Sequence, residues 1–228
     1  MPVTPPQKRH PYNQWAPDAR ALDLVGDKWT LLIVRDLSAG PRRFVELQRV
    51  LPGISTEQLR SRLNRMVADG LVTRQRYREV PPRVDYELTE RSKELLPVLG
   101  ALARWGHDWV WTAPRDGEAI DVGAILRICP GLVHPPRGVA GVAELSVRLP
   151  DGSTRFYTLT AGRGAVTIVE REAPEADARV RGSERDWIDA LGPGASRDGL
   201  SIEGDKRLAG VLLDGFAPAV ADRAAEVA

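Results

Sequence analysis

Hydrophobic residues recur at helical spacing through the first half of the chain, and the pattern is clearest in residues 55–70. The recurring positions are Leu59, Leu63, Met66 and Val67. Their spacing of i, i+4, i+7 and i+8 predicts one buried stripe along a helix. Ser55 followed by Gln58 is a capping-box start, and Gly70 is the expected left-handed stop, so the helix should span these residues.

The opposite face of this predicted helix is polar and rich in arginine. The side chains on that face and at its borders are Ser55, Thr56, Glu57, Gln58, Arg60, Ser61, Arg62, Asn64 and Arg65. Such side chains bind base edges and phosphates when a helix lies in the major groove of DNA. A solvated amphipathic helix with no partner is the alternative interpretation of the same pattern.

The neighbouring segments favour the nucleic-acid interpretation. Residues 18–38 suit a helix or a broken helix pair, and residues 42–51 suit a short helix that Pro52-Gly53 ends. A short helix, a tight turn and a polar second helix make the helix-turn-helix pattern. Residues 71–77 and 83–89 then alternate in polarity, which predicts a hairpin directly after the second helix, in the place of a wing.

Arginines lie at the edges of this predicted motif. Arg42 and Arg43 begin the short helix, and Arg78 and Arg83 flank the hairpin tip. They are candidates for contacts to phosphate or to a narrow minor groove. An ordinary surface hairpin with solvated arginines is the alternative.

A more apolar helix is predicted over residues 90–112, with Pro97 as a kink or a first-turn residue. Its candidate interface residues are Leu95, Leu99, Leu102, Trp105 and Trp109. Large aromatic anchors of this kind are typical of interfaces. The stripe therefore predicts either a dimerisation helix or a helix that packs onto the second half of the chain.

The second half has a different pattern. A helix is predicted over residues 120–129, strands over 141–149, 154–160, 165–171 and 177–181, and helices over 183–191 and 205–216. An antiparallel meander of strands followed by helices that cover one face predicts an α+β layer. We thus expect a flexible arm at residues 1–15, a DNA-binding and dimerisation domain at 16–113, and a second domain at 118–228.

Charge and composition agree with this division. Residues 1–115 contain 19 Lys and Arg against 13 Asp and Glu, whereas residues 116–228 contain 13 against 18. The basic half is therefore the one expected to meet a polyanion. The single cysteine, Cys129, excludes an intrachain disulfide, and without a basic neighbour at helical spacing a buried structural thiol is favoured over a reactive one.

Motifs for enzymatic chemistry are missing from the sequence. There is no nucleophile elbow, phosphate loop or dinucleotide glycine fingerprint, and the three histidines lack metal-ligand spacing. We therefore expect no enzyme, cofactor or metal. The chain has no membrane-spanning apolar run and no signal-peptide core, so a cytoplasmic protein is expected.

Several runs resemble the HxlR-type winged-helix regulators, which are relatives of the MarR group. The matching runs are Ala16-Pro17, residues 22–32, Gly40-Pro41-Arg42-Arg43-Phe44, residues 51–55, residues 69–72 and residues 80–89. The resemblance covers roughly residues 15–110. It implies a homodimeric repressor or activator that binds a palindromic operator. Many members carry a sensing cysteine where this chain has Ala16, so thiol sensing at that position is excluded.

Residues 118–220 are similar to sterol-carrier-protein-like domains, which hold apolar ligands between sheet and helices. The similarity rests on the meander, on Asp186-Trp187 opening a helix, and on residues 199–205 ahead of the last helix. Phe156, Tyr157, Trp187 and Phe216 are candidates for an apolar pocket lining, with ordinary core packing as the alternative.

Together these features predict a two-domain, dimeric regulator that binds double-stranded DNA and responds to an apolar small molecule. Two other interpretations of the C-terminal domain remain open. In the first, the domain is purely structural. In the second, it is a lipid-handling or catalytic domain, and the DNA-binding domain of the same chain serves only to regulate the protein's own expression.

Overall fold

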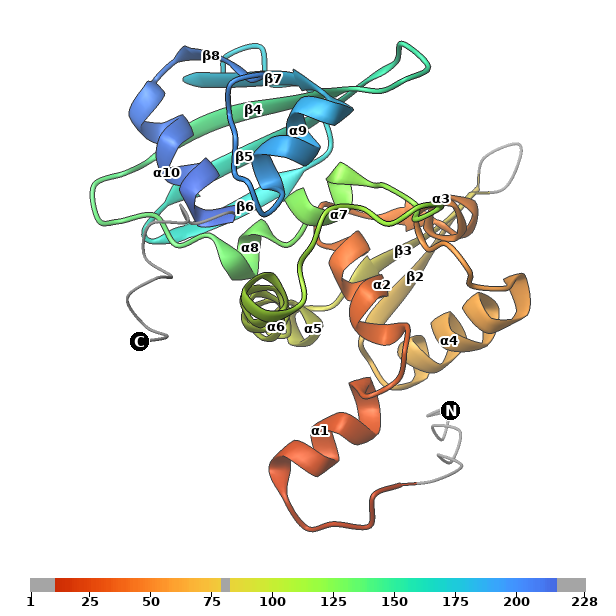
Figure 1. Ribbon diagram of the computed structural model, residues 1–228. Coiled ribbons are helices and arrows are strands. Elements are labelled where there is room, and N and C mark those ends of the chain that lie inside the picture. Colours follow the sequence, from red (N-terminus) through yellow and green to blue (C-terminus); the bar gives the residue numbers. More distant parts are fainter. Residues whose placement is uncertain (1–10, 79–82, 217–228) are drawn as a thin grey trace. The chain divides into compact units, whose positions relative to one another are not determined.

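The computed structural model describes residues 11–78 and 83–216. Part of the predicted arm, the tip of the predicted hairpin and the end of the predicted second domain lie outside these ranges. The chain divides into two compact units, residues 1–96 and 97–228 (Figure 1). The division lies between Leu96 and Pro97.

The helices of the N-terminal unit follow the hydrophobic pattern closely. They are α1 (Pro17–Val25), α2 (Thr30–Leu37), α3 (Phe44–Val50), α4 (Thr56–Ala68) and α5 (Glu90–Lys93). Ile33, Leu47 and Leu59 are fully buried at the centre of this unit. Residues 18–38 form a broken helix pair, one of the two arrangements that the sequence allowed.

A turn with a left-handed glycine connects α3 to α4. Gly53 has a φ of +82°, a value that costs other residues about 1 kcal/mol or more, and Ile54 is buried beside it. The predicted helix-turn-helix is therefore present. The predicted wing is present as well, as β2 (Val72–Tyr77) paired antiparallel with β3 (Arg83–Leu88). The sequence did not predict β1 (Arg42–Arg43), which pairs with the other side of β3.

The C-terminal unit contains a five-stranded sheet. Its strands are β4 (Gly141–Arg148), β5 (Thr154–Gly162), β6 (Ala165–Val169), β7 (Ala178–Ser183) and β8 (Ser201–Gly204), in the order β6-β5-β4-β7-β8. The prediction of an antiparallel meander is wrong at one place, because β7 pairs parallel with β4. Residues 170–177 carry the chain from the β6 edge past β4, so β7 enters in the same direction as β4. Strand β8 was not predicted.

Helices cover one face of this sheet. Figure 1 shows α9 (Glu184–Leu191) and α10 (Lys206–Phe216) against the strands, and both contact β7 and β4. Alternation along the strands places Leu145, Leu159 and Val180 on this covered face, where each is fully buried. The two helices were predicted within a residue or two of their ends.

Two predicted helices are interrupted, and Pro97 is a first-turn residue, one of the two roles that the sequence allowed. Residues 90–112 form α5 and α6 (Leu96–Trp109), and residues 120–129 form α7 (Val122–Leu126) followed by α8 (Cys129–Leu132). A proline lies near the start of each second piece, Pro97 in α6 and Pro130 in α8. Proline has no N–H to donate to the carbonyl four residues earlier, so each helix breaks before it.

Helix α6 packs closely against other parts of the C-terminal unit. A side-chain carbon added at Gly100 would lie 1.8 Å from the carbonyl oxygen of Gly131 in α8. Arg104 Nη1 donates a hydrogen bond to the carbonyl of Leu132 at 3.3 Å, and the Trp111 indole donates one to the carbonyl of Leu191 at 3.2 Å. These contacts explain why α6 is grouped with the second unit.

Cys129 at the start of α8 is fully buried, and this burial raises the pKa of its thiol well above the ordinary value. The proton is therefore held more firmly than on a free thiol, and the reactive thiolate is suppressed. The favoured prediction of a structural cysteine agrees with this environment.

Candidate nucleic-acid interface

Helix α4 begins with a capping box. The Gln58 amide N–H donates to Ser55 Oγ at 3.1 Å, and the Ser55 amide N–H donates to Gln58 Oε1 at 3.1 Å. This reciprocal pair satisfies two backbone donors at the helix start and fixes where α4 begins. Leu59, Leu63 and Met66 are buried beneath it, so the predicted stripe is confirmed at those three positions, whereas Val67 is 37% exposed.

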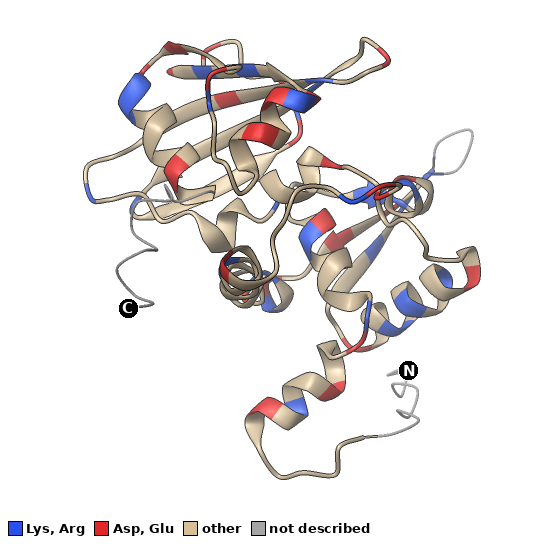
Figure 2. Ribbon diagram, in the orientation of Figure 1, with Lys and Arg blue, Asp and Glu red and all other residues tan. Residues whose placement is uncertain are grey.

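The opposite face of α4 is open to solvent. Thr56, Gln58, Arg60, Ser61 and Asn64 are exposed, and Figure 2 shows basic residues along this helix. Arg60 pairs with Glu57 at 3.0 Å on the same exposed face. The Thr56 hydroxyl accepts a hydrogen bond at 2.7 Å from the Gln48 amide of α3. The polar surface that the sequence predicted is thus accessible, with the Thr56 hydroxyl already oriented by α3.

Two arginines of α4 lie at the border of this face and pair within the protein. Arg62 Nη1 lies 2.9 Å from Asp27 Oδ2, and Arg65 Nε lies 3.9 Å from Asp69 Oδ2. Their side chains are 25% and 24% exposed. Both were predicted as DNA contacts, and both have intramolecular carboxylates that compete for them.

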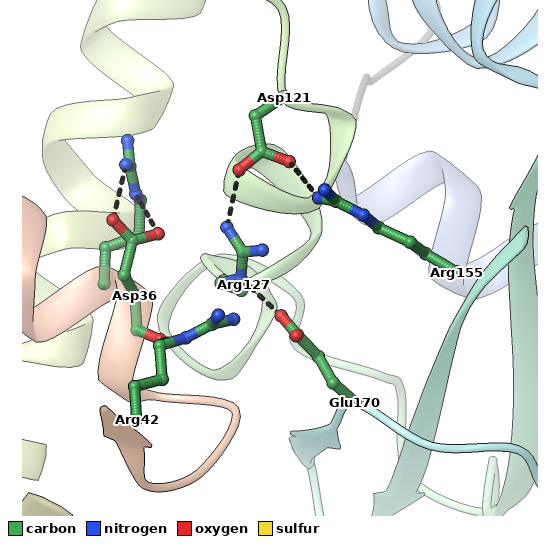
Figure 3. A network of polar contacts seen from close by, with 7 residues as sticks. Asp36, Arg42, Asp121, Arg127, Arg155 and Glu170 are labelled. Atoms are coloured by element: carbon green, nitrogen blue, oxygen red, sulfur yellow. Dashed lines mark hydrogen bonds and ion pairs between the residues drawn. The ribbon is translucent and has the colours of Figure 1, made fainter. Parts of the chain in front are cut away.

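Arg42 also has an internal role. Its Nε donates a hydrogen bond at 2.6 Å to the backbone carbonyl of Asp36, at the end of α2 (Figure 3). The Asp36 carboxylate is fully buried and accepts from the Arg35 guanidinium at 2.9 and 3.3 Å. These contacts join α2 to β1 and place Arg43, the next residue, at the surface with half of its side chain exposed.

The wing contains a further internal pair. Arg83 Nε donates to both carboxylate oxygens of Asp85 at 2.9 Å, and its Nη2 donates at 2.5 Å. Asp85 is buried, and the hydrogen bond from Arg83 lowers the pKa of its carboxyl below the ordinary value. Arg43 Nε lies 4.0 Å from the same carboxylate. The Nε and Nη2 groups of Arg83, which could otherwise donate to a phosphate, already donate to Asp85. Arg83 is therefore less available to DNA than the sequence indicated.

Strand β2 offers basic residues that the sequence analysis did not single out. Arg74 and Arg76 are exposed, and alternation places both on one face of the strand. The Arg74 guanidinium lies over the Tyr86 ring at 5.9 Å from its centroid. Arg78, which was predicted, continues the same alternation and is exposed. The repeat of arginine at every second residue was the signal that could have identified this basic edge.

The predicted interface residues of α6 divide into two groups. Leu102, Trp105 and Trp109 are 53%, 56% and 73% exposed, and Val98 joins them at 51%. Leu99, in contrast, is buried at 6% exposure. Leu99 therefore contributes to the fold of its own chain, and Val98 replaces it in the exposed apolar stripe. Leu95 is half-buried and precedes α6.

The candidate pocket residues lie on two faces of the C-terminal sheet. Tyr157, Trp187 and Phe216 are buried on the helix-covered side, where the Trp187 indole donates to the carbonyl of Ser146 at 2.8 Å. Phe156 is adjacent to Tyr157 on β5, so its side chain points to the opposite face. Phe156 cannot line a pocket shared with the other three.

A polar cluster lies at the edge of the covered face. Arg127 is buried and pairs with Asp121 at 2.9 Å and Glu170 at 2.6 Å, and Arg155 lies 3.5 Å from the other oxygen of Asp121 (Figure 3). The Tyr157 hydroxyl lies beside Gly123 of α7, and it is buried without a hydrogen-bond partner among the described residues. Burial raises the pKa of Tyr157, so the hydroxyl keeps its proton.

In the described ranges, 11–78 and 83–216, no group of three or more His, Cys, Asp or Glu side chains could hold a metal ion. None of the helices described is long and apolar enough to cross a membrane.

Comparison with known proteins identifies the N-terminal region. A family model described as HxlR-like helix-turn-helix matches residues 24–113. An uncharacterised HTH-type transcriptional regulator from Synechocystis sp. is 43% identical over 94 residues, which cover 41% of this chain and 70% of that relative. The chain belongs to the HxlR-like helix-turn-helix family.

Two further proteins match a similar share of the chain. The uncharacterised HTH-type transcriptional regulator YvaP of Bacillus subtilis is 36% identical over 91 residues, covering 40% of this chain and 84% of YvaP. The solved structure of the reduced transcriptional regulator YodB of Bacillus subtilis is 33% identical and covers 42% of this chain and 96% of YodB, with a TM-score of 0.38. The family match ends at residue 113, before the region for which a sterol-carrier-like fold was predicted.

Proposed function

We propose that this HxlR-like protein is a homodimeric transcriptional regulator that inserts α4 into the major groove of a two-fold-symmetric DNA site. The observation that carries the proposal is the exposed polar face of α4. A capping box fixes the start of this helix, and a basic wing follows it in the chain. The relatives are named as transcriptional regulators, which points to a non-enzymatic role for this chain as well.

The exposed residues of α4 are assigned to the bases. These are Thr56, Gln58, Arg60, Ser61 and Asn64. Four arginines of the wing region are assigned to the DNA backbone, because their side chains reach solvent. Arg43 on β1 is half exposed, and Arg74 and Arg76 on β2 and Arg78 just after β2 are exposed. The remaining candidates have partners within the protein, and we assign them to supporting the fold of the interface. They are Arg42, Ser55, Arg62, Arg65 and Arg83.

Dimerisation is assigned to the exposed stripe of α6. Val98, Leu102, Trp105 and Trp109 follow a spacing of i, i+4, i+7 and i+11, which is the heptad spacing of paired helices. Burying these half-exposed side chains on two protomers would contribute on the order of 10 kcal/mol, against an association cost of about 4–15 kcal/mol. The stripe alone is thus marginal.

Regulation is assigned to the C-terminal unit. An apolar or amphipathic molecule between the sheet and its helices would contact Tyr157, Trp187 or Phe216, all of which are now buried. Helix α6 contacts α8 of the same unit through Gly100 and Arg104, so a ligand that repositions α8 would reposition the dimer stripe. A tenfold preference for one arrangement corresponds to about 1.4 kcal/mol.

The test begins with selection of DNA from a random pool by the purified full chain, followed by anisotropy titrations at two salt concentrations. The selected sites should contain inverted half-sites about one helical turn apart. Arg60→Ala and Asn64→Ala should each cost about 1–3 kcal/mol and relax base choice at one position. Recovery of no sequence, together with equal binding by both variants, would refute the recognition role of α4.

The dimer and the effector have separate measurements. Leu102→Glu, on the stripe, should shift sedimentation toward monomer, whereas Ala101→Glu, an exposed neighbour on α6, should not. A small molecule that binds the folded protein raises its stability by about RT ln(1 + [L]/Kd), so pools of apolar metabolites are screened by melting temperature. If no pool shifts melting or DNA binding, the C-terminal unit is structural; turnover of a hit would indicate a catalytic domain.

A further inference from the structure

The Arg62–Asp27 ion pair links the recognition helix to the start of α2. Arg62 Nη1 lies 2.9 Å from Asp27 Oδ2, and each side chain is 25% exposed. Asp27 lies 35 positions before Arg62 in the sequence, so the pair is a tertiary contact and not a contact between neighbours on one helix.

Hydrogen bonds from the start of α2 hold the Asp27 carboxylate in place independently of Arg62. Its Oδ1 accepts hydrogen bonds from the backbone N–H groups of Trp29 at 2.9 Å and Thr30 at 3.1 Å, and its Oδ2 accepts one from the Thr30 hydroxyl. Thr30 and its neighbour Ile33 are fully buried, which anchors the start of α2 in the core. The Asp27 carboxylate is thus held in a fixed position relative to the start of α2.

Two further hydrogen bonds join the ends of α4 to the rest of the unit. Gln48 Nε2 donates to Thr56 Oγ1 at the first turn, and Arg91 Nη1 donates at 3.1 Å to the carbonyl of Asp69 after the last turn. Arg62 lies between these points, next to the exposed Ser61 and two residues from Asn64. Rotation of α4 about its axis would stretch this central pair.

We propose that Asp27 is a positioning residue for DNA recognition, which holds Arg62 so that α4 presents Ser61 and Asn64 to the bases at one rotation. Arg62 then acts through the orientation of α4 and does not itself neutralise a phosphate. This inference rests on the proposed DNA-binding function.

The opposite assignment, in which Arg62 binds DNA directly, predicts effects of opposite sign. If Asp27 only competes with DNA for Arg62, then Asp27→Asn frees a cation and tightens binding. If Asp27 positions α4, then Asp27→Asn weakens binding to the selected sequence. The asparagine oxygen still accepts the backbone hydrogen bonds at α2, so the fold of the unit should persist.

The experiment measures the affinity of the full chain for its selected DNA and for random DNA, over a range of salt. Asp27→Asn and Arg62→Gln should each weaken specific binding about tenfold, leave random-DNA binding within about twofold, and leave the salt slope unchanged. Arg62→Lys should restore most of the specificity, since lysine can still pair with Asp27.

Glu57→Gln is the matched control, because it also removes one carboxylate near an arginine of α4. Glu57 is exposed and pairs with Arg60 on the DNA-facing side. Its neutralisation should tighten binding to both DNAs, because it removes a charge that repels phosphate. Opposite signs for Asp27→Asn and Glu57→Gln support the positioning role.

Tighter or unchanged specific binding by Asp27→Asn would overturn the inference, and so would a salt slope reduced by about one in Arg62→Gln. Amide hydrogen exchange of the free protein gives a readout without DNA: exchange in α4 should accelerate in Asp27→Asn and not in Glu57→Gln. Failure of the unaltered chain to bind any DNA would refute the proposed function, whereas equal α4 exchange in all three proteins would refute this inference alone.

Discussion

Gly100→Ala tests the packing of α6 against α8 within the C-terminal unit. The added carbon would lie 1.8 Å from the Gly131 carbonyl oxygen, 2.3 Å from its carbon and 2.9 Å from the Leu132 nitrogen. Ordinary contact begins at 3.4 Å, so the two backbones would have to separate by roughly 1.6 Å. All three contacted atoms belong to the main chain, and no side-chain rotation can relieve the overlap.

The expected free energies have opposite signs. Replacing glycine by alanine inside a helix stabilises by about 1 kcal/mol when nothing else changes. Overpacking a filled interior costs about 1–3 kcal/mol, and we take the upper end because both partners are backbone. The net loss is then about 2 kcal/mol, which for a chain of this size lowers Tm by about 4–8 °C.

Gly106→Ala in the same helix is the matched control. An added carbon at Gly106 meets only Val110 Cγ2 at 3.9 Å, which is ordinary contact. This variant should be stabilised by about 1 kcal/mol, raising Tm by about 2–4 °C. Calorimetry of both full-length variants decides the question. If Gly100→Ala is as stable as Gly106→Ala, α6 does not pack on α8 as described.

Three further outcomes are expected. Tyr157→Phe should raise the free energy of unfolding by about 1 kcal/mol in urea titrations, because it removes a buried hydroxyl that has no partner among the described residues; a loss of similar size would mean that the hydroxyl has one. Asp85→Asn should lower stability at neutral pH. Because the folded pKa of Asp85 is depressed, the stabilisation is present above the unfolded value of about 3.9 and lost as pH falls through the folded value, so the two proteins should converge in acid unfolding below about pH 4. Arg74→Gln should weaken binding to all DNA sequences alike and reduce the salt slope by about one, and a change in sequence preference instead would assign Arg74 to a base.

Local signals in the sequence predicted much of the N-terminal unit. The capping box at Ser55, the apolar repeat through Leu63 and the Pro52-Gly53 turn each act within a few residues, so they hold in the structure regardless of distant contacts. The same is true of most strands and helices in the second half. Their alternation states which residues share a face, and burial follows it along β6 and β7. In β4 and β5 the second face is buried as well, at Glu144, Ser146 and Thr158.

The roles of individual arginines were less predictable. Arg60 and Arg62 are two residues apart and chemically identical, yet one faces solvent and the other meets Asp27. The partner of Arg60 is Glu57, three residues away, which helical spacing indicates. The partner of Arg62 lies 35 residues away, and periodicity carries no information about that distance. The pair Arg83–Asp85 is closer in sequence, but its strength depends on the burial of Asp85, which only the assembled sheet provides.

The sequence by itself determined the order of most elements, the helix-turn-helix and wing, the basic character of the first half and the family of the chain. Only the tertiary structure decided the parallel pairing of β7 with β4, the side of α6 that is covered, and the carboxylate that pairs with Arg62. The reason is physical. Hydrophobic periodicity specifies that a face must be covered, whereas the identity of the covering element depends on how distant segments share one volume.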